Sequence, residues 1–159
     1  MYSKRNKTLV LTGAVNDEMF KTLMRSIDQT PSTILINTEG GELYAALAIY
    51  DLIRSELPKV TIIACGACMS AGMIIMQAGF KRVAYENAQI MVHYGEDSNT
   101  SVGELKHNIH LSEIHAQILA KRSFVPVKKI KTAWFVRDTY MTAEQALNYG
   151  LLDYVLEIK

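Results

Sequence analysis

The most apolar stretch of the chain, residues 60–80, restricts the fold more than any other segment. It is interrupted by Cys-Gly-Ala-Cys, Ser70 and Gly72, and its flanks do not resemble membrane anchors, so we predict a buried strand followed by a buried helix. The helix, residues 70–78, is apolar all round with small residues early, which is typical of a helix enclosed on every side. The fold must therefore surround this central helix with other structure.

Short β-branched runs alternate with helical patterns along the rest of the chain. Strands are predicted at residues 7–13, 32–37, 59–65, 81–87 and 89–94, and helices at residues 17–29, 42–57, 70–78, 102–122 and from Thr142 to Gly150. Strands that alternate with helices indicate an α/β fold with a largely parallel sheet.

Several helices carry local signals for where they start and which face they bury. Capping residues are expected at Asn16 or Asp17, at Ser101 with Glu104, and at Thr142 with Gln145. The buried face of the second helix is expected to consist of Leu43, Leu47, Tyr50, Ile53 and Leu57.

Length and composition favour a single globular domain, and the charge pattern favours no highly charged partner. The 159 residues are 49% hydrophobic and 21% charged, so we expect a single domain over residues 1–159. The net charge of +1 comes from scattered residues, so neither nucleic acid nor a membrane surface is an expected partner. Two cysteines and the lack of a signal-peptide core at the N-terminus favour a cytoplasmic location.

Cys65 and Cys68 have the spacing of a dithiol redox motif. In that chemistry the first cysteine begins a helix, whereas Cys65 is predicted to end a strand, with the helix starting nearer Ser70. A zinc site would need further ligands at suitable spacing, and the chain has no other cysteine, so no metal is expected. The main interpretation is two small buried side chains. Redox sensing stays open as an alternative.

Ser70 is a candidate nucleophile because it lies at the turn from a buried strand into a buried helix. The free N–H groups of the helix start face the same space, which suits acyl transfer. The Gly-x-Ser-x-Gly elbow of many hydrolases is not met, since Cys68 replaces its first glycine. A serine in this position can also be a simple helix cap. As a nucleophile it needs a histidine base and an orienting carboxylate.

The chain offers four histidines as candidate bases. His93 ends an apolar strand before a polar loop, a common position for a base, although a structural core histidine would look the same. The other three, His107, His110 and His115, lie on the predicted helix 102–122. His107 and His110 are three residues apart, and for these two we favour a solvated helix face over a metal site.

Two acidic residues compete for the orienting position, and a glycine pair suggests an anion site. Asp138 precedes the last capped helix, whereas Asp153 follows Gly150, and the sequence favours Asp138 only slightly. Gly40 and Gly41 follow a strand, where their N–H groups can turn toward a ligand oxygen or simply form a tight turn. The dinucleotide fingerprint is not met, so no cofactor is expected.

Five stretches, in order and in register, resemble the proteolytic subunits of the Clp protease (ClpP) over residues 9–156. They are LTGAVND, INTEGGELYAALAIYDLI, GACMSAGMIIMQAG, IMVHY and RDTYMTAEQALNYGLLDYVLE. The resemblance implies a serine endopeptidase with Ser70 as nucleophile, His93 as base and Asp138 as orienting carboxylate. It implies an oxyanion hole formed by the backbone N–H groups of Gly41 and Ala71.

The same resemblance implies the fold and the assembly. The expected fold is a crotonase-like β-α superhelix, with the helix over residues 102–122 as a protruding handle between two stacked seven-membered rings. The expected partners are further copies of the chain in a homo-oligomer, heptameric or tetradecameric, and a peptide or unfolded-protein substrate inside an enclosed chamber. A catalytically silent subunit of a mixed ring with another ClpP-type chain is the alternative, although no triad residue is missing.

The chain departs from the family pattern at three places. Glu39 replaces a proline before Gly40, and Tyr94-Gly95 followed by Glu96 and Asp97 replaces a Gln-Pro pair, which predicts a more flexible and acidic loop. The sequence also starts close to its first core strand, so from the resemblance we expect the chain to lack most of the N-terminal segment that forms the axial gate in the family. Docking on an AAA+ unfoldase is therefore left open.

Overall fold

The computed structural model describes residues 2–3, 7–94 and 102–158. The strands are β1 (Tyr2–Ser3), β2 (Thr8–Thr12), β3 (Thr33–Thr38), β4 (Thr61–Met69), β5 (Lys81–Tyr85), β6 (Gln89–Val92), β7 (Thr139–Thr142) and β8 (Tyr154–Leu156). The helices are α1 (Asp17–Met24), α2 (Leu43–Glu56), α3 (Ala71–Ala78), α4 (Val102–Ala120), α5 (Val127–Lys129) and α6 (Ala143–Asn148), with a 3-10 turn η1 (Ile27–Gln29) and a π-helical turn η2 (Ile130–Trp134). The predicted alternation of strands and helices is confirmed.

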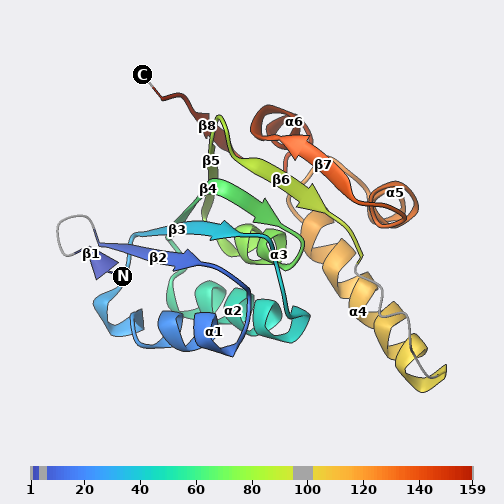
Figure 1. The fold of residues 1–159 in the computed structure, drawn as a ribbon, viewed down its shortest axis with the longest axis horizontal. Coiled ribbons are helices and arrows are strands. Elements are labelled where there is room, and N and C mark those ends of the chain that lie inside the picture. Colours follow the sequence, from blue (N-terminus) through green and yellow to red (C-terminus); the bar gives the residue numbers. More distant parts are fainter. Residues whose placement is uncertain (1, 4–6, 95–101, 159) are drawn as a thin grey trace.

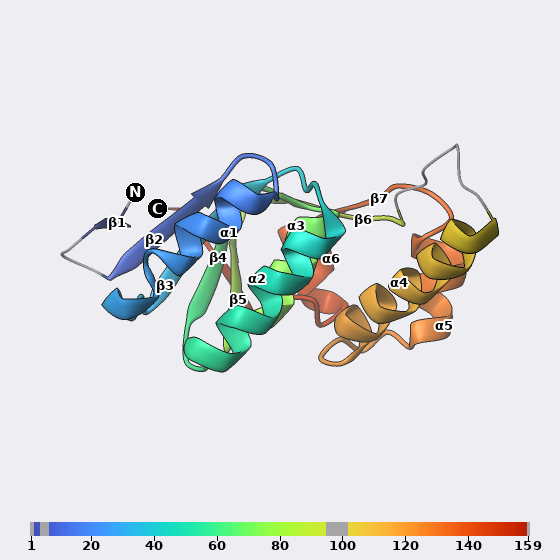
Figure 2. The same cartoon turned by 90° about the horizontal axis from the view of Figure 1, so that it is seen from below.

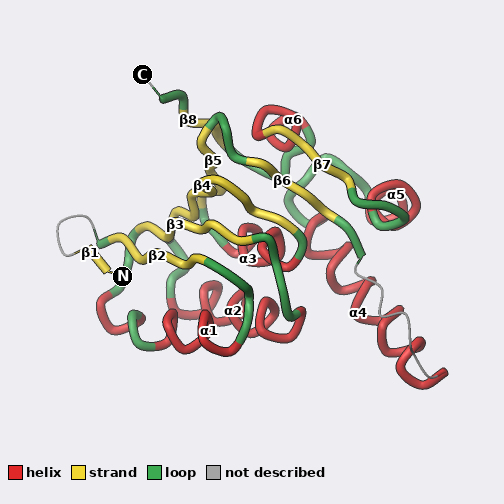
Figure 3. The backbone as a smooth tube through the Cα atoms, viewed as in Figure 1, coloured by secondary structure: helices red, strands yellow, loops and turns green. Residues whose placement is uncertain are grey.

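The strands form one twisted sheet with the order β1-β2-β3-β4-β5-β8 in the described ranges. Neighbours from β2 to β8 along this path are parallel, and the short β1 is antiparallel to β2. Helices α1, α2 and α3 lie on the same face of the sheet (Figures 1 and 2). A second branch, β6 with antiparallel β7, leaves the sheet at the end of β4 (Figure 3). The predicted, largely parallel sheet is confirmed.

Strand β4 is longer than predicted because it changes partner halfway along. Residues 61–64 pair with β5, and residues 67–69 pair with β6. Gly66 lies between the two parts with φ +77°, and a Cβ there would lie 2.8 Å from Asn37 Oδ1. The prediction that the strand ends at Cys65 is therefore wrong: the chain bends at Gly66 and continues as strand to Met69.

Helix α3 is the centre of the core, as its composition predicts. All its residues from Ala71 to Ala78 are buried, and it packs against α2, β4 and α4. The predicted buried face of α2 is only partly right, since Ile53 and Leu57 are buried but Leu43, Leu47 and Tyr50 are half-buried. The fully buried helical positions are instead Ala45, Ala46, Ile49 and Ile53. Small alanine side chains let α2 lie close to α3, which the spacing of large residues could not indicate.

The last helices complete the fold at the opposite end from α1. Helix α4 begins away from the sheet and runs back toward α3 (Figure 1), in line with the predicted helix over residues 102–122. The Thr142 capping box with Gln145 is confirmed, whereas Ser101 and the Glu104 side chain lie outside the described residues. Within the described ranges, no helix combines the length and apolar composition that crossing a membrane requires.

Candidate active site

Strand register brings Ser70, His93 and Asp138 together. Met69 at the end of β4 pairs with Met91 of β6, so Ser70 follows beside the end of β6. Val92, the last residue of β6, pairs with Thr139, the first residue of β7. His93 and Asp138 therefore lie opposite each other, one step beyond this antiparallel pair. Strand β7 was not predicted from the sequence, yet it is the element that positions Asp138.

The three side chains form a continuous hydrogen-bonded chain. His93 Nε2 lies 2.8 Å from Ser70 Oγ, and His93 Nδ1 lies 2.9 Å from Asp138 Oδ1. The imidazole is 27% exposed and the carboxylate 55% exposed. An imidazole held between a hydroxyl and a carboxylate can take a proton from the hydroxyl while the carboxylate stabilises the resulting positive charge.

Ser70 has a strained backbone that fixes its hydroxyl in this position. Its φ of 51° and ψ of −121° lie in a region that non-glycine residues rarely adopt. The Ser70 N–H donates to Met91 O at 2.8 Å, and the Ser70 carbonyl accepts from Met73 N–H at 2.9 Å. The alternative that Ser70 serves as a helix cap is wrong, because its side chain makes no capping hydrogen bond.

Gly40 and Gly41 form a tight turn beside Ser70. Val15 N–H donates to Gly40 O, and Glu42 N–H donates to Val15 O, both at 2.8 Å. In a parallel bridge of this kind, the N–H of the residue between the two bonded groups points away from the partner, so the Gly41 N–H faces the other side. Neither position admits a side chain, because a Cβ would lie 2.8 Å from Ser70 Cβ at Gly40 and 2.4 Å from Val15 O at Gly41.

A cavity of about 470 Å³ opens beside these groups. Gly41, Ser70, Ala71 and His93 line one part of it, and residues of α4 line another. Its size is within the usual range for small-ligand sites. The site therefore combines a hydroxyl, an imidazole and backbone donors at the wall of one accessible pocket.

The histidines of α4 divide into two kinds. His107 and His110 are exposed, as expected for a solvated face, and His107 Nε2 contacts the Tyr44 hydroxyl from α2. His115, in contrast, is only 3% exposed and lines the cavity. Burial, followed by the nearby His93, lowers the pKa of His115 to about 3. His115 follows the apolar Leu111 by four residues, so both lie on the same face of α4. This spacing is the sequence signal that could have indicated its burial.

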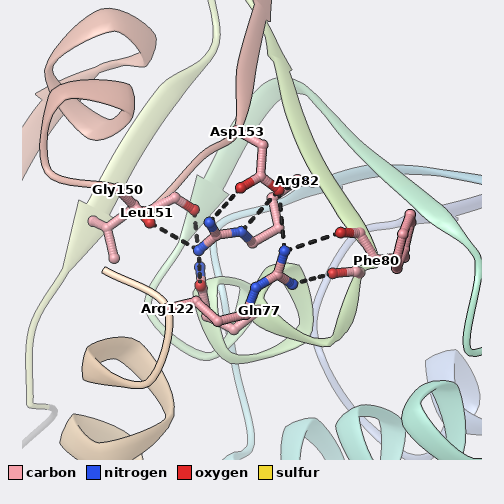
Figure 4. A network of polar contacts seen from close by, with 8 residues as sticks. Gln77, Phe80, Arg82, Arg122, Gly150, Leu151 and Asp153 are labelled. Atoms are coloured by element: carbon pink, nitrogen blue, oxygen red, sulfur yellow. Dashed lines mark hydrogen bonds and ion pairs between the residues drawn. The ribbon is translucent and has the colours of Figure 1, made fainter. Parts of the chain in front are cut away.

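Asp153, the other candidate carboxylate, belongs to a separate polar network (Figure 4). Its two oxygens accept from the Arg82 side chain at 2.5 and 3.1 Å, and Arg122 donates to it at 3.2 Å. Arg82 also donates to Gln77 Oε1 at 2.7 Å and to Gly150 O at 2.8 Å. Burial alone would raise the pKa of Asp153, but the hydrogen bonds and charge of Arg82, with the charge of Arg122, hold it below its usual value.

The two cysteines lie on β4 with unreactive surroundings. Cys68 is fully buried, and burial, followed by the effect of Cys65, raises the pKa of its thiol to about 12. Burial also raises the pKa of the half-buried Cys65. Both thiols therefore remain protonated, which disfavours the redox alternative. In the part of the chain that the structure describes, no cluster of three or more His, Cys, Asp or Glu side chains could hold a metal ion.

A serine, histidine and aspartate in one hydrogen-bonded chain, carried by an α/β fold, is the arrangement of serine hydrolases. A family model described as Clp protease matches residues 3–159. The chain therefore belongs to the Clp protease family, as its sequence motifs predict.

Two curated proteins and one solved structure illustrate the relationship. The chain is 38% identical over 129 residues to the ATP-dependent Clp protease proteolytic subunit of Deinococcus radiodurans, covering 77% of this chain and 63% of that protein. It is 35% identical over 155 residues to the ATP-dependent Clp protease proteolytic subunit 2 of Streptomyces coelicolor, covering 90% of this chain and 70% of that protein. The chain thus spans less than two thirds of the Deinococcus relative.

The structural comparison concerns the fold. The structure of a ClpP1 N165D mutant from Listeria monocytogenes matches with a TM-score of 0.87 at 24% identity, covering 98% of this chain and 94% of that one. The predicted ClpP-type α/β fold is therefore confirmed.

Proposed function

We propose that this chain is a serine endopeptidase that cleaves peptides or unfolded proteins through an acyl-enzyme on Ser70. The observation that carries the proposal is the hydrogen-bonded chain from Ser70 through His93 to Asp138, with distances of 2.8 and 2.9 Å. Family membership supports the same conclusion. We further propose that residues 1–159 act as one peptidase domain.

His93 is the general base of the proposed reaction. Its Nε2 takes the proton from Ser70 Oγ as that oxygen attacks the carbonyl carbon of the substrate. Asp138 accepts a hydrogen bond from His93 Nδ1–H, which orients the ring and stabilises the imidazolium. His93 then returns the proton to the leaving amine, and the peptide bond breaks.

The backbone N–H groups of Gly41 and Ala71 are the proposed oxyanion hole. Ala71 is the first residue of α3, where helix N–H groups have no intrahelical partner. Gly41 is held by its bridge to Val15, so its N–H is fixed before substrate binds. Two fixed donors stabilise the tetrahedral oxygen, and losing one such donor typically lowers the rate by about 10² to 10³.

Water completes the proposed cycle without a cofactor. His93 deprotonates a water molecule that attacks the acyl-enzyme. It then gives that proton to Ser70 Oγ as the ester bond breaks and the acid product leaves, which restores the serine hydroxyl. None of these steps consumes a nucleotide. The relatives are named ATP-dependent, and in our proposal any such dependence comes from a separate partner that unfolds the substrate.

The proposed assembly is a homo-oligomer of heptameric rings, stacked as a tetradecamer with the active sites facing a chamber. The relatives are named as subunits. Exposed large apolar side chains in the C-terminal half of the chain support contacts between subunits. Phe124 is 81% exposed, Val136 69% and Ile109 56%. The two unpaired cysteines are consistent with the cytoplasmic location that we propose.

Hydrolysis of a fluorogenic peptide by the assembled protein tests the proposed activity. We expect turnover by the wild type and loss of it in Ser70→Ala. The matched control is Ser55→Ala, because Ser55 is exposed on α2 and outside the cavity. Equal turnover in wild type and Ser70→Ala would contradict the proposal, as would a fully assembled wild type that cleaves no peptide.

A further inference from the structure

The cavity beside Ser70 contains a histidine that the proposed mechanism does not use. His115 of α4 is 3% exposed and lines this cavity. Its Nε2 is buried and has no hydrogen-bond partner in the described part of the chain. A buried polar atom without a partner is unfavourable and rare in native proteins. Because His115 also lines the cavity, a group bound there would complete the hydrogen bonding of this ring.

Among the residues of α4 that line the cavity, His115 is the most buried. Asn108, Leu111 and His115 are spaced by three and four residues, so they form one stripe along α4, and all three line the cavity. Exposure decreases along this stripe, since Asn108 is half-buried, Leu111 is 8% exposed and His115 is 3% exposed. Ser70 and Ala71 line the same cavity as this stripe, so a peptide carbonyl at Ser70 would bring the residue before the scissile bond into it.

His115 presents a neutral hydrogen-bonding group rather than a charge. The low pKa, caused by burial and by His93, keeps the ring neutral. A neutral imidazole has one N–H donor and one bare nitrogen acceptor, so it can bond a group that donates or accepts. The Phe135 ring lies 4.9 Å away, centroid to centroid, and restricts the imidazole from the side. Glu42 also lines the cavity but is exposed to solvent, where water and salt screen its charge.

We propose that His115 is a specificity-determining residue that selects substrates whose residue before the scissile bond ends in an uncharged hydrogen-bonding group, as glutamine does. This inference rests on the proposed function, because it requires acyl transfer at Ser70. An apolar side chain fills the cavity but leaves Nε2 without a partner. A carboxylate loses its hydration opposite a neutral ring that cannot balance its charge. The preferred class is therefore peptides with glutamine or asparagine at this position.

Three fluorogenic peptides that differ only before the scissile bond test the inference. Glutamine, norleucine and glutamate have side chains of similar length, and we expect kcat/KM to be about tenfold higher for glutamine than for norleucine, with glutamate lowest. In His115→Leu the glutamine-to-norleucine ratio should fall to about one or below. In His115→Gln, which keeps a donor and an acceptor, the ratio should stay within about threefold of wild type.

The matched control is His110→Leu. His110 lies on the same helix, is exposed and does not line the cavity, so its replacement should leave the ratio unchanged. Titration with a fluorophosphonate counts the reactive Ser70 groups in each preparation, and all rates are expressed per reactive site.

The outcomes separate this inference from the proposed function. A wild type that takes up no fluorophosphonate contradicts the proposed function itself. A wild type that labels and cleaves, but prefers norleucine or shows no preference, overturns the role of His115 alone. The same conclusion follows if His115→Leu and His110→Leu give the same glutamine-to-norleucine ratio. If His115→Leu does not fold, a ratio that falls to one in His115→Gln also overturns the inference.

Discussion

Asp138 and Asp153 occupy equivalent places in the chain but have opposite surroundings. Each immediately precedes a strand, Asp138 before β7 and Asp153 before β8. Asp153 meets two arginines, of which Arg82 has only 3% of its side chain exposed (Figure 4). Asp138 is 55% exposed and meets the imidazole of His93. Identical side chains thus join a charged network in one region and, in the proposed mechanism, assist proton transfer in the other.

The difference follows from whether the partner of each carboxylate gains and loses a proton. Arginine keeps its proton at all ordinary pH values, so the Asp153 pair is fixed and joins α3, β5 and the chain before β8. Histidine gains and loses a proton near neutral pH, so a carboxylate beside it can assist a reaction. We therefore predict that removing Asp138 affects catalysis alone and that removing Asp153 affects stability alone.

Asp138→Asn should have the largest effect. We expect kcat for peptide hydrolysis to fall by about 10⁴-fold, because the amide favours the wrong histidine tautomer. The free energy of unfolding should change by less than about 0.5 kcal/mol, since the side chain is more than half exposed. Peptide kinetics and urea unfolding at a fixed protomer concentration measure the two quantities. Asp51→Asn, at an exposed position of α2, is the control. A loss of kcat smaller than tenfold in Asp138→Asn would remove Asp138 from the mechanism.

Asp153→Asn should give the reverse pattern. Breaking the pair leaves the buried Arg82 charge without its partner, which we expect to lower the free energy of unfolding by about 3 kcal/mol at pH 7. The kcat of the folded fraction should stay within about threefold of wild type. Asp28→Asn, an exposed substitution, is the control. A variant as stable as wild type would show that the network in Figure 4 does not stabilise the fold.

The acid side of the stability curve sharpens the same prediction. The folded pKa of Asp153 is lower than its unfolded value, so its stabilisation is present above the ordinary carboxyl pKa, near 4, and is lost as the pH falls through the folded pKa. Unfolding free energies measured below pH 4 should therefore decrease less steeply in Asp153→Asn than in wild type. Equal slopes in the two proteins would contradict the lowered pKa.

The buried His115 gives a second pH dependence of stability, in a higher pH range than that of Asp153. The unfolded chain binds a proton to His115 as the pH falls below about 6.5, while the folded chain resists it until a pH of about 3. The contribution of neutral His115 to the free energy of unfolding is therefore fully present above pH 6.5. It decreases on acidification, by roughly 2 kcal/mol at pH 5. Unfolding curves of wild type and His115→Gln between pH 7 and pH 5 measure this. A wild type with no more pH dependence than the variant would contradict burial of a neutral ring.

Ser70→Gly should have a small effect on stability, of the opposite sign to that of Asp153→Asn. Glycine adopts the observed φ of 51° without strain. We expect the free energy of unfolding to rise by about 1 kcal/mol, after the higher entropy of glycine in the unfolded chain is subtracted. Thermal unfolding compared with Ser70→Ala isolates the backbone effect, since both variants lack the hydroxyl. A glycine variant less stable than the alanine variant would show that Ser70 is not strained.

The sequence predicts the elements better than their pairing. The apolar helix from Ala71 to Ala78 and the capping box at Thr142 could be located because their signals are local. The bend of β4 at Gly66 could not, because it depends on a change of neighbouring strand. The burial of His115 depends likewise on α4 packing beside Phe135. Long-range contacts of this kind leave no periodic pattern in the chain.

The candidate site shows the same limit. Residue types and a family resemblance pointed to Ser70, His93 and Asp138, but the residues alone favoured Asp138 over Asp153 only slightly. What separates the two aspartates is the pairing of Val92 with Thr139, which sets Asp138 opposite His93. That register depends on β7, a short and mostly polar strand that carries no strong sequence signal.

Mapping of a fluorophosphonate adduct tests the central claim most directly. The assembled wild-type protein is treated with the probe, digested and analysed by mass spectrometry, alongside His93→Ala and the control His110→Ala. We predict one adduct on Ser70 in wild type and in His110→Ala. Labelling of His93→Ala should be at least a hundredfold slower, because the serine then lacks its base. An adduct on another residue, or equal labelling of Ser70 without His93, would contradict it.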